Sequence, residues 1–107
     1  MFARILRMQI KIDKIDEAVK LFKTGVVPLC KKQPGFEGAY YMTDSKKGEG
    51  VAITLWKSEK DMLANEKSHF FQEQVAKFVG FYAMPPIREA YEVALKEEMK
   101  TPQKLKV

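Results

Sequence analysis

The sequence has few of the residues on which disulfide-bonded, metal-binding and membrane-spanning proteins depend. Its 107 residues include one cysteine, Cys30, which excludes an internal disulfide and is typical of a reducing cytoplasm. One cysteine and one histidine, His69, are too few to hold a metal ion. No run of about 18 apolar residues is present to span a membrane. Charges at Arg4 and Arg7 interrupt the N-terminal segment, unlike a secretory signal. We therefore expect a cytoplasmic protein with no metal and no membrane partner.

Arginine is also scarce, although positive charge is in excess. Nineteen basic residues against fourteen acidic ones give a formal charge of +5, which raises the question of a nucleic-acid partner. Only three of the basic residues are arginine, and the lysines are scattered over polar faces and the C-terminal segment. A nucleic-acid surface would instead gather them in a stripe interleaved with aromatic residues. We expect no nucleic-acid partner and attribute the charge to solubility.

Short apolar segments, most of them alternating with polar residues, predict four strands. The alternation has the period of two that a strand requires. The polar heptapeptide "DSKKGEG" lies between the second and third segments and can close a hairpin between them. The predicted strands are residues 2–12, 36–43, 51–56 and 87–95.

Two helical regions lie between these strands. Asp13 is a candidate N-cap for an amphipathic helix that is weakened near its end by Gly25 and Pro28. Ser58 and Ser68 are candidate N-caps of two consecutive shorter helices, and the sequence "MPP" is expected to end this second region. The predicted helices are residues 14–32, 59–65 and 69–81.

The order β-α-β-β-α-β predicts an α+β, ferredoxin-like fold. In this plan a four-stranded antiparallel sheet has the strand order 4-1-3-2 and carries both helical regions on one face. One domain is expected over residues 1–96. Residues 97–107 are charged and contain a proline, and we interpret them as a C-terminal tail.

The other face of this sheet is expected to be covered by a second subunit. Both crossovers of the plan fall on the same side, so the helices cover one face only. Left in water, nine bulky apolar side chains would form a patch well above the few hundred Å² that a monomer tolerates. An obligate homodimer through the sheet face is therefore predicted. These side chains share one parity on three strands: Leu6, Met8, Ile10, Val51, Ile53, Leu55, Tyr91, Val93 and Leu95.

These features resemble the antibiotic biosynthesis monooxygenase (ABM) family over about residues 2–96. The resemblance is carried by "PGFEGAYYM", "VAITLWKSEKDM" and "REAYEVAL" in the predicted element order. It implies a dimeric α+β barrel in which each subunit keeps a cavity between its sheet and its helices. It also implies that the strand side chains of the bulky set contact the partner subunit. The side chains at the alternating positions, which are smaller and include Arg7, Ala52 and Trp56, would line the cavity. Small side chains there leave volume that a plain core would not waste.

The resemblance also suggests site residues. Cofactor-free members that oxidise polycyclic phenols use an asparagine and a tryptophan on the third strand; Trp56 matches the tryptophan, and Ala52 replaces the asparagine. Quinol-oxidising relatives carry a histidine near the start of the second short helix, where His69 lies. The asparagine, tryptophan and histidine of haem-degrading members are all replaced here, so haem degradation of that type is not expected. Their positions fall near Arg7, Asn65 and Val75.

Each candidate has two readings. His69 can act as the general base that removes a phenolic proton, since its usual pKa of about 6.5 suits this task, or it is a surface residue. Trp56 either positions an aromatic substrate or anchors the core at the strand end. Asn65 either hydrogen-bonds a substrate oxygen or ends its helix. Arg7 and Arg88 either clamp an anionic substrate group or pair with a nearby glutamate.

Aromatic side chains are expected around the cavity or the dimer interface. Phe78 is the member of this set that we assign to substrate binding. At helical spacing such residues are more often part of a core. The set comprises Tyr40, Tyr41, Phe70, Phe71, Phe78, Phe81 and Tyr82.

The sequence thus leads to a cofactor-independent monooxygenase, using neither metal nor flavin, that oxidises a small electron-rich aromatic of the quinol or phenol type. The alternative is a non-catalytic binding module for a hydrophobic ligand such as haem or a quinone. A third reading is a structural dimer whose cavity is filled by side chains. A cavity of about 300 Å³ or more beside Trp56 would favour the first two over the third.

Overall fold

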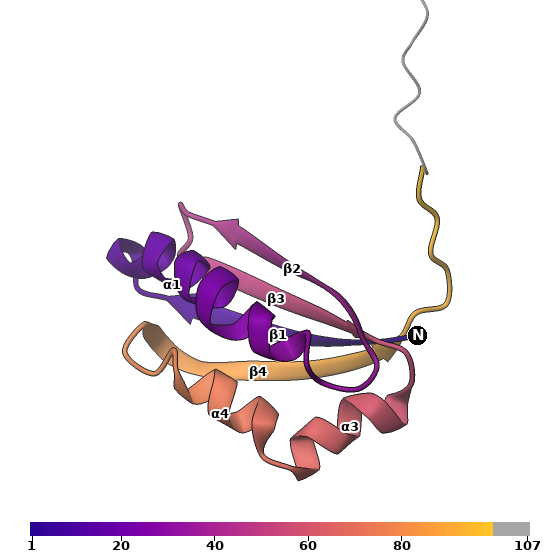
Figure 1. The fold of residues 1–107 in the computed structure, drawn as a ribbon. Coiled ribbons are helices and arrows are strands. Elements are labelled where there is room, and N and C mark those ends of the chain that lie inside the picture. The colour runs from indigo at the N-terminus through magenta and orange to yellow at the C-terminus, as the bar shows by residue number, and fades with distance from the viewer. Residues whose placement is uncertain (100–107) are drawn as a thin grey trace, which may run out of the picture.

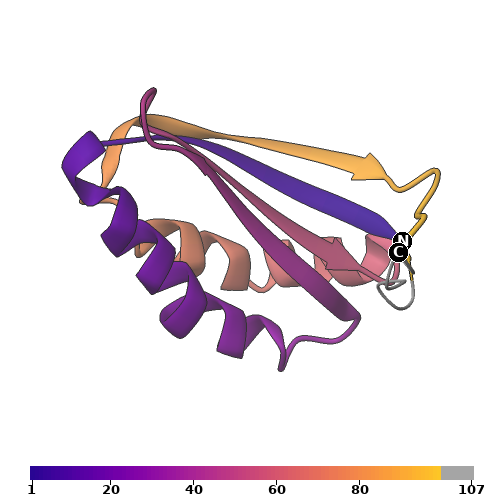
Figure 2. The same ribbon diagram turned by 90° about the horizontal axis from the view of Figure 1, so that it is seen from above.

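A four-stranded antiparallel sheet carries all the helices on one face in the computed structural model, which describes residues 1–99 (Figures 1 and 2). The strand order β2-β3-β1-β4 confirms the predicted order and the α+β, ferredoxin-like plan. Of the predicted tail, residues 100–107 lie outside the described residues. The strands are β1 (Phe2–Ile10), β2 (Phe36–Asp44), β3 (Glu49–Trp56) and β4 (Tyr82–Glu92).

The first helical region is continuous but changes its pitch, as Gly25 and Pro28 predicted. Pro28 has no backbone N–H and cannot donate a hydrogen bond to the carbonyl four residues earlier in the chain. The helix is wider, with π-helical geometry, just before Pro28. The prediction of Asp13 as an N-cap is wrong, because the region begins with a tight turn whose capping residues make no side-chain hydrogen bond. Its segments are η1 (Ile12–Lys14), α1 (Ile15–Leu21), η2 (Phe22–Val26) and α2 (Val27–Cys30).

The second helical region consists of α3 (Glu59–Lys67) and α4 (Phe70–Ala76). Ser58 caps α3 as predicted, since its side chain accepts a hydrogen bond from the Asp61 backbone N–H at 3.1 Å. The prediction of Ser68 as the cap of the next helix is wrong. Ser68 ends α3, and His69 precedes α4 with a left-handed backbone, φ 69°. Within residues 1–99, none of the helices is long and apolar enough to cross a bilayer.

Strand β4 begins five residues earlier than predicted, at Tyr82 instead of residue 87. The segment "MPP" was expected to end the helical region, yet it lies inside this strand. An edge strand tolerates proline because one side of its backbone has no partner strand to which an N–H would be donated. The pairing with β1 is irregular next to this segment, with register shifts on either side of Gln9.

The expected assignment of β1 to the two faces is wrong. Leu6 pairs with Ala52 and Arg4 with Thr54, so these four side chains share the face toward the helices. Met8 and Ile10 follow on the same face and are buried in the core. Arg7 points to the opposite face. Strand β1 has apolar residues at both odd and even positions, so its own sequence pattern does not show which set of side chains faces the helices. The pairing register with β3 shows it.

One face of the sheet, here called the open face, is covered by no helix (Figure 2). This face is nevertheless apolar. Its side chains come from all four strands, and several are at least half exposed, among them Tyr40, Met42, Ile87 and Tyr91. Arg7 lies among them and pairs with Glu89 on the neighbouring strand. The apolar members are Ile5, Tyr40, Met42, Val51, Ile53, Leu55, Ile87 and Tyr91.

Candidate functional site

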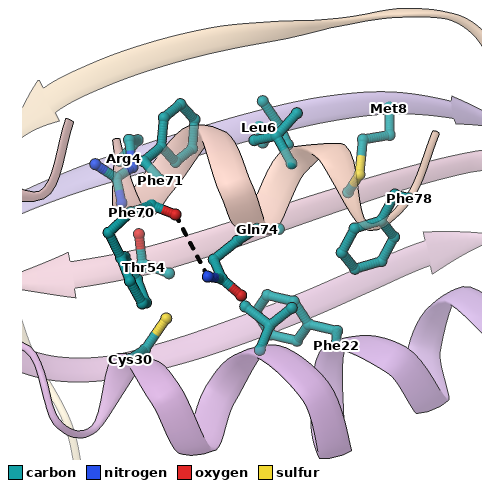
Figure 3. Close-up of a pocket in the computed structure, with 13 residues that line it drawn as sticks. Arg4, Leu6, Met8, Phe22, Cys30, Thr54, Phe70, Phe71, Gln74 and Phe78 are labelled. Carbon is teal, nitrogen blue, oxygen red and sulfur yellow. Dashed lines mark hydrogen bonds between the residues drawn. The ribbon is translucent and has the colours of Figure 1, made fainter. Parts of the chain in front are cut away.

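A cavity lies between the helix-facing side of the sheet and the helices (Figure 3). Strands β1 and β3 form its floor, and η2, α2 and α4 form its walls. All but four of the thirteen lining residues are apolar or aromatic: Arg4, Leu6, Met8, Phe22, Val26, Cys30, Ala52, Thr54, Phe70, Phe71, Gln74, Val75 and Phe78.

The cavity is small, with a volume of about 50 Å³. This is room for a few water molecules and is below the ~300–1,000 Å³ of typical small-molecule sites. The volume beside Trp56 that would favour the two ligand-binding readings is therefore absent, and by this criterion the structure favours a cavity filled by side chains. An aromatic ring is larger than this volume and does not fit unless lining side chains are displaced.

Gln74 supplies the most unusual atom of the cavity. Its side chain is 7% exposed, and its amide nitrogen donates a long hydrogen bond of 3.4 Å to the carbonyl of Phe70 (Figure 3). Its Oε1 is the one buried side-chain nitrogen or oxygen without a hydrogen-bond partner among residues 1–99. An orphaned buried acceptor costs about 1–3 kcal/mol. No protein group among residues 1–99 donates to this atom, so its donor must come from a molecule in the cavity, such as water or a ligand.

Thr54 is the second polar group, and Trp56 holds it in place. The indole N–H of Trp56 donates to the Thr54 hydroxyl oxygen at 2.9 Å. The threonine thus accepts one bond and keeps its own proton for donation. Trp56 itself is fully buried, packs edge-on against Phe36 and does not line the cavity. It contacts the lining residues Thr54 and Arg4.

Arg4 forms the charged end of the cavity. It is 4% exposed, and its Nη1 donates to the Met62 carbonyl at 3.2 Å, to Asn65 Oδ1 at 2.7 Å and to Glu66 Oε2 at 3.1 Å. Arg88 on β4 donates to the same Glu66 oxygen at 2.8 Å. Helix α3 is thereby bound to strands β1 and β4.

Aromatic rings enclose the Arg4 guanidinium, whose central carbon lies 4.0 Å from the Phe71 ring centre and 5.3 Å from that of Trp56. Burial lowers the pKa of Arg4 from its usual value, although arginine stays protonated. Burial alone would raise the pKa of Glu66, but hydrogen bonds from Arg88 and Arg4 hold that pKa below its usual value. Both groups are therefore charged near neutral pH.

The structure brings some of the predicted site residues together and separates others. Ala52 and Phe78 line the cavity, and Asn65 and Arg88 join it through the Arg4 cluster. His69 is exposed at the junction of α3 and α4 and is not a lining residue. The expectation that Arg7 lines the cavity is wrong, because Arg7 lies on the open face. Arg7 pairs with Glu89 and Arg88 with Glu66, as the ion-pair reading of the two arginines requires.

Three polar cavity residues were not singled out from the sequence: Arg4, Thr54 and Gln74. A signal existed for two of them. Arg4 shares its parity with Leu6 and Met8, and a charge in such a row is unusual. Gln74 stands four residues after Phe70 and four before Phe78, so it occupies an apolar stripe of its helix. Residues 1–99 contain no group of three or more histidine, cysteine, aspartate or glutamate side chains that could hold a metal ion.

The fold and cavity define a small α+β domain with an internal, largely apolar site. Residues 1–77 match the family described as antibiotic biosynthesis monooxygenase, and the chain belongs to that family. This confirms the resemblance seen in the sequence. A comparison with curated proteins finds none that matches this chain.

Solved structures of low sequence identity share the fold. A putative antibiotic biosynthesis monooxygenase of Deinococcus radiodurans is 11% identical with a TM-score of 0.73, over 94% of this chain and 100% of that one. A Streptomyces coelicolor monooxygenase in complex with nanaomycin D is 17% identical with a TM-score of 0.71, over 91% and 92%. A haem degrader of Mycobacterium tuberculosis with two haems bound in its active site is 18% identical with a TM-score of 0.68, over 92% and 100%.

Proposed function

We propose that this protein is a monooxygenase that oxidises a small phenol or quinol in the cavity between sheet and helices. One observation carries the proposal: the buried acceptor Gln74 Oε1 has no protein partner among residues 1–99 in this largely apolar cavity. A phenolic O–H satisfies this atom, while aromatic walls such as Phe78 hold the ring. The Streptomyces coelicolor monooxygenase that shares this fold is in complex with nanaomycin D, and this supports a small organic ligand for the present chain.

The reaction uses the electrons of the substrate itself, with no metal or flavin. The quinol loses a proton, and the electron-rich anion reduces molecular oxygen. One oxygen atom becomes a ring substituent and the other leaves as water, so that quinol plus O₂ gives hydroxyquinone plus water. The substrate supplies all four electrons. The protein contributes orientation and a dry cavity.

The proton leaves through water, because none of the thirteen lining residues is histidine, aspartate or glutamate. His69, at the start of α4, is the candidate that accepts it outside the cavity. Trp56 acts by holding the Thr54 hydroxyl in position. Helix α4 carries four of the lining residues. His69, which precedes it, has a left-handed backbone conformation that is uncommon for residues other than glycine. Outward movement of this short helix admits the ring.

The protein acts as a homodimer through the open face. At roughly 1.5–3 kcal/mol for each large apolar side chain that is fully buried, covering this face stabilises a dimer substantially. The assignment differs from the sequence prediction in its residues, since Ile5 replaces Leu6, Met8 and Ile10 on this face. Val93 and Leu95 were also expected on it, but β4 ends at Glu92, three residues before the predicted end. A reducing cytoplasm is the proposed compartment and suits the free, buried Cys30.

Oxygen uptake by the purified protein with a panel of quinols tests the proposal. Wild type is expected to accelerate uptake with at least one quinol, and Gln74→Leu to abolish the acceleration. Gln72→Leu, on the exposed side of the same helix, is the matched control and should retain it. No acceleration with any quinol, or full activity in Gln74→Leu, contradicts the proposal.

The absence of an ionisable base from the cavity lining favours a second candidate, a module that binds a phenol or quinone without changing it. Native mass spectrometry after exposure to oxygen separates the two. A retained ligand of unchanged mass favours binding alone, whereas a gain of one oxygen and loss of two hydrogens favours the monooxygenase.

A further inference from the structure

Arg4 is the one charged residue among the thirteen that line the cavity. A charge in a nearly apolar site is costly unless it is fully balanced by its neighbours. The ionisable groups that interact with it are Glu66, Arg88 and Cys30. Burial raises the pKa of the Cys30 thiol, so the thiol is neutral near pH 7. The balance is therefore between two arginines and one glutamate.

This balance leaves an excess of positive charge. Glu66 Oε2 accepts from Arg4 at 3.1 Å and from Arg88 at 2.8 Å, so one carboxylate serves two cations. Two positive charges and one negative charge sum to +1. The remaining contacts of Arg4 are neutral: a backbone carbonyl of Met62, the Asn65 side-chain oxygen and two aromatic rings. They hold the guanidinium in place and do not cancel its charge.

The hydrogen bonds of Arg4 also leave one edge of the guanidinium unused. All three of its bonds to residues 1–99 start from Nη1, and none starts from Nε or Nη2. Nε and Nη2 form the side of the planar fork that binds a carboxylate with two parallel hydrogen bonds. The contacts to Phe71 and Trp56 fix the plane of the fork. A bidentate anion site is thus already oriented.

We propose that the substrate is an aromatic carboxylate whose carboxyl group binds the Nε and Nη2 edge of Arg4 while a ring hydroxyl donates to Gln74 Oε1. The inference rests on the proposed function for its site and names the class of molecule that the site takes. Arg4 and Gln74 line the same small cavity, and they offer groups of opposite hydrogen-bonding character: the Nε and Nη2 donors, from which no hydrogen bond to residues 1–99 starts, and the Oε1 acceptor, which has no protein partner there (Figure 3). A carboxylate supplies the acceptors that Arg4 requires, and a phenol supplies the donor that Gln74 requires.

A pair of isosteric ligands tests the charge. 2,5-Dihydroxybenzoate and 2,5-dihydroxybenzamide are both quinols of nearly the same shape, and only the first carries a negative charge at pH 7. Calorimetric titration of the full chain is expected to give a Kd at least tenfold lower for the carboxylate. Equal affinity, tighter binding of the amide, or binding of neither overturns the inference.

The same ligands separate this inference from the proposed oxidation. Tight binding of the carboxylate without oxygen uptake removes the monooxygenase and leaves the inference standing. Turnover of the neutral amide or of unsubstituted quinols, with no preference for the carboxylate, removes the inference and leaves the monooxygenase standing.

Variants of the two partners of Arg4 change its charge balance without removing Arg4 itself. Arg88→Gln brings the cluster to a net charge of 0 and is expected to weaken carboxylate binding about three- to tenfold; Glu66→Gln brings it to +2 and should strengthen binding by a similar factor. Amide binding should change less than twofold in both. Lys60→Gln, an exposed charge on α3, is the control and should change neither. Shifts in the same direction for both variants, or equal shifts for carboxylate and amide, contradict the inference.

Discussion

Replacing Gln74 by leucine is expected to stabilise the protein while it removes ligand binding. In the unliganded chain the Gln74 Oε1 acceptor is buried without a partner, and such an atom costs about 1–3 kcal/mol. The variant also loses the hydrogen bond to Phe70, but at 3.4 Å that bond is weak and is worth at most about 0.5–1 kcal/mol. Leucine adds apolar contact with the surrounding walls. The net change is about 1 kcal/mol in favour of the folded state.

Thermal and urea unfolding measure this change at fixed protein concentration. For a domain of this size, about 1 kcal/mol corresponds to an increase in Tm of roughly 4–8 °C. Gln72→Leu is the control: its amide donates to the Glu66 carbonyl at 3.1 Å from an exposed position, so the variant should be neutral or slightly less stable. A Gln74→Leu variant less stable than wild type would show that the orphaned oxygen is satisfied in solution. The argument from an unpaired acceptor would then be wrong.

Three further predictions concern the open face, the Arg4 cluster and Trp56. Ile53→Asp places a charge in the centre of the open face and should dissociate the dimer and lower the free energy of unfolding by about 3 kcal/mol or more. Light scattering checks this, with Ile12→Asp, outside the sheet, as control; a monomeric wild type refutes it. Because its folded pKa is lowered from 4.5, Glu66 stabilises the fold above that pH, and this stability is lost as pH falls through the folded pKa. The stability difference between wild type and Glu66→Gln should shrink from pH 6 to pH 3 in urea titrations; a constant difference would contradict it. Trp56→Phe loses the bond to Thr54 and leaves space, and should cost about 1–3 kcal/mol and weaken ligand binding. Unchanged melting and binding would show that the indole N–H positions nothing.

The order of the elements could be predicted because each strand and helix carries its own local signal. The alternation in "VAITLW" and the cap at Ser58 act within a few residues, and both are present in the structure. The boundary between α4 and β4 could not be predicted in the same way. Pro85 and Pro86 indicate a break in most contexts, and only the position of β4 at the edge of the sheet allows them inside a strand.

The faces of the sheet depended on information that is not local. Strand β1 has apolar residues on both parities, with Ile5 on one and Leu6 on the other. Which parity faces the helices follows from the pairing of Leu6 with Ala52, a contact between residues 46 positions apart. A shift of one residue exchanges the two faces completely. The error moved Arg7 into the expected cavity and left Arg4 out of consideration.

The same reasoning explains why the polar groups of the site lie where sequence patterns do not place them. A charged or amide side chain at a core position lowers stability, so core positions are predicted from apolar residues. Arg4 and Gln74 are exceptions to that pattern and are therefore missed. Natural chains depart from local rules mainly where function requires it. In this chain the position that corresponds to the family's strand-three asparagine is Ala52, which offers no polar atom. Arg4 on β1 and Gln74 on α4 provide one donor edge and one acceptor to the same cavity. In the proposed complex the polar contacts to the ligand therefore come from β1 and α4, and Ala52 on β3 contributes none.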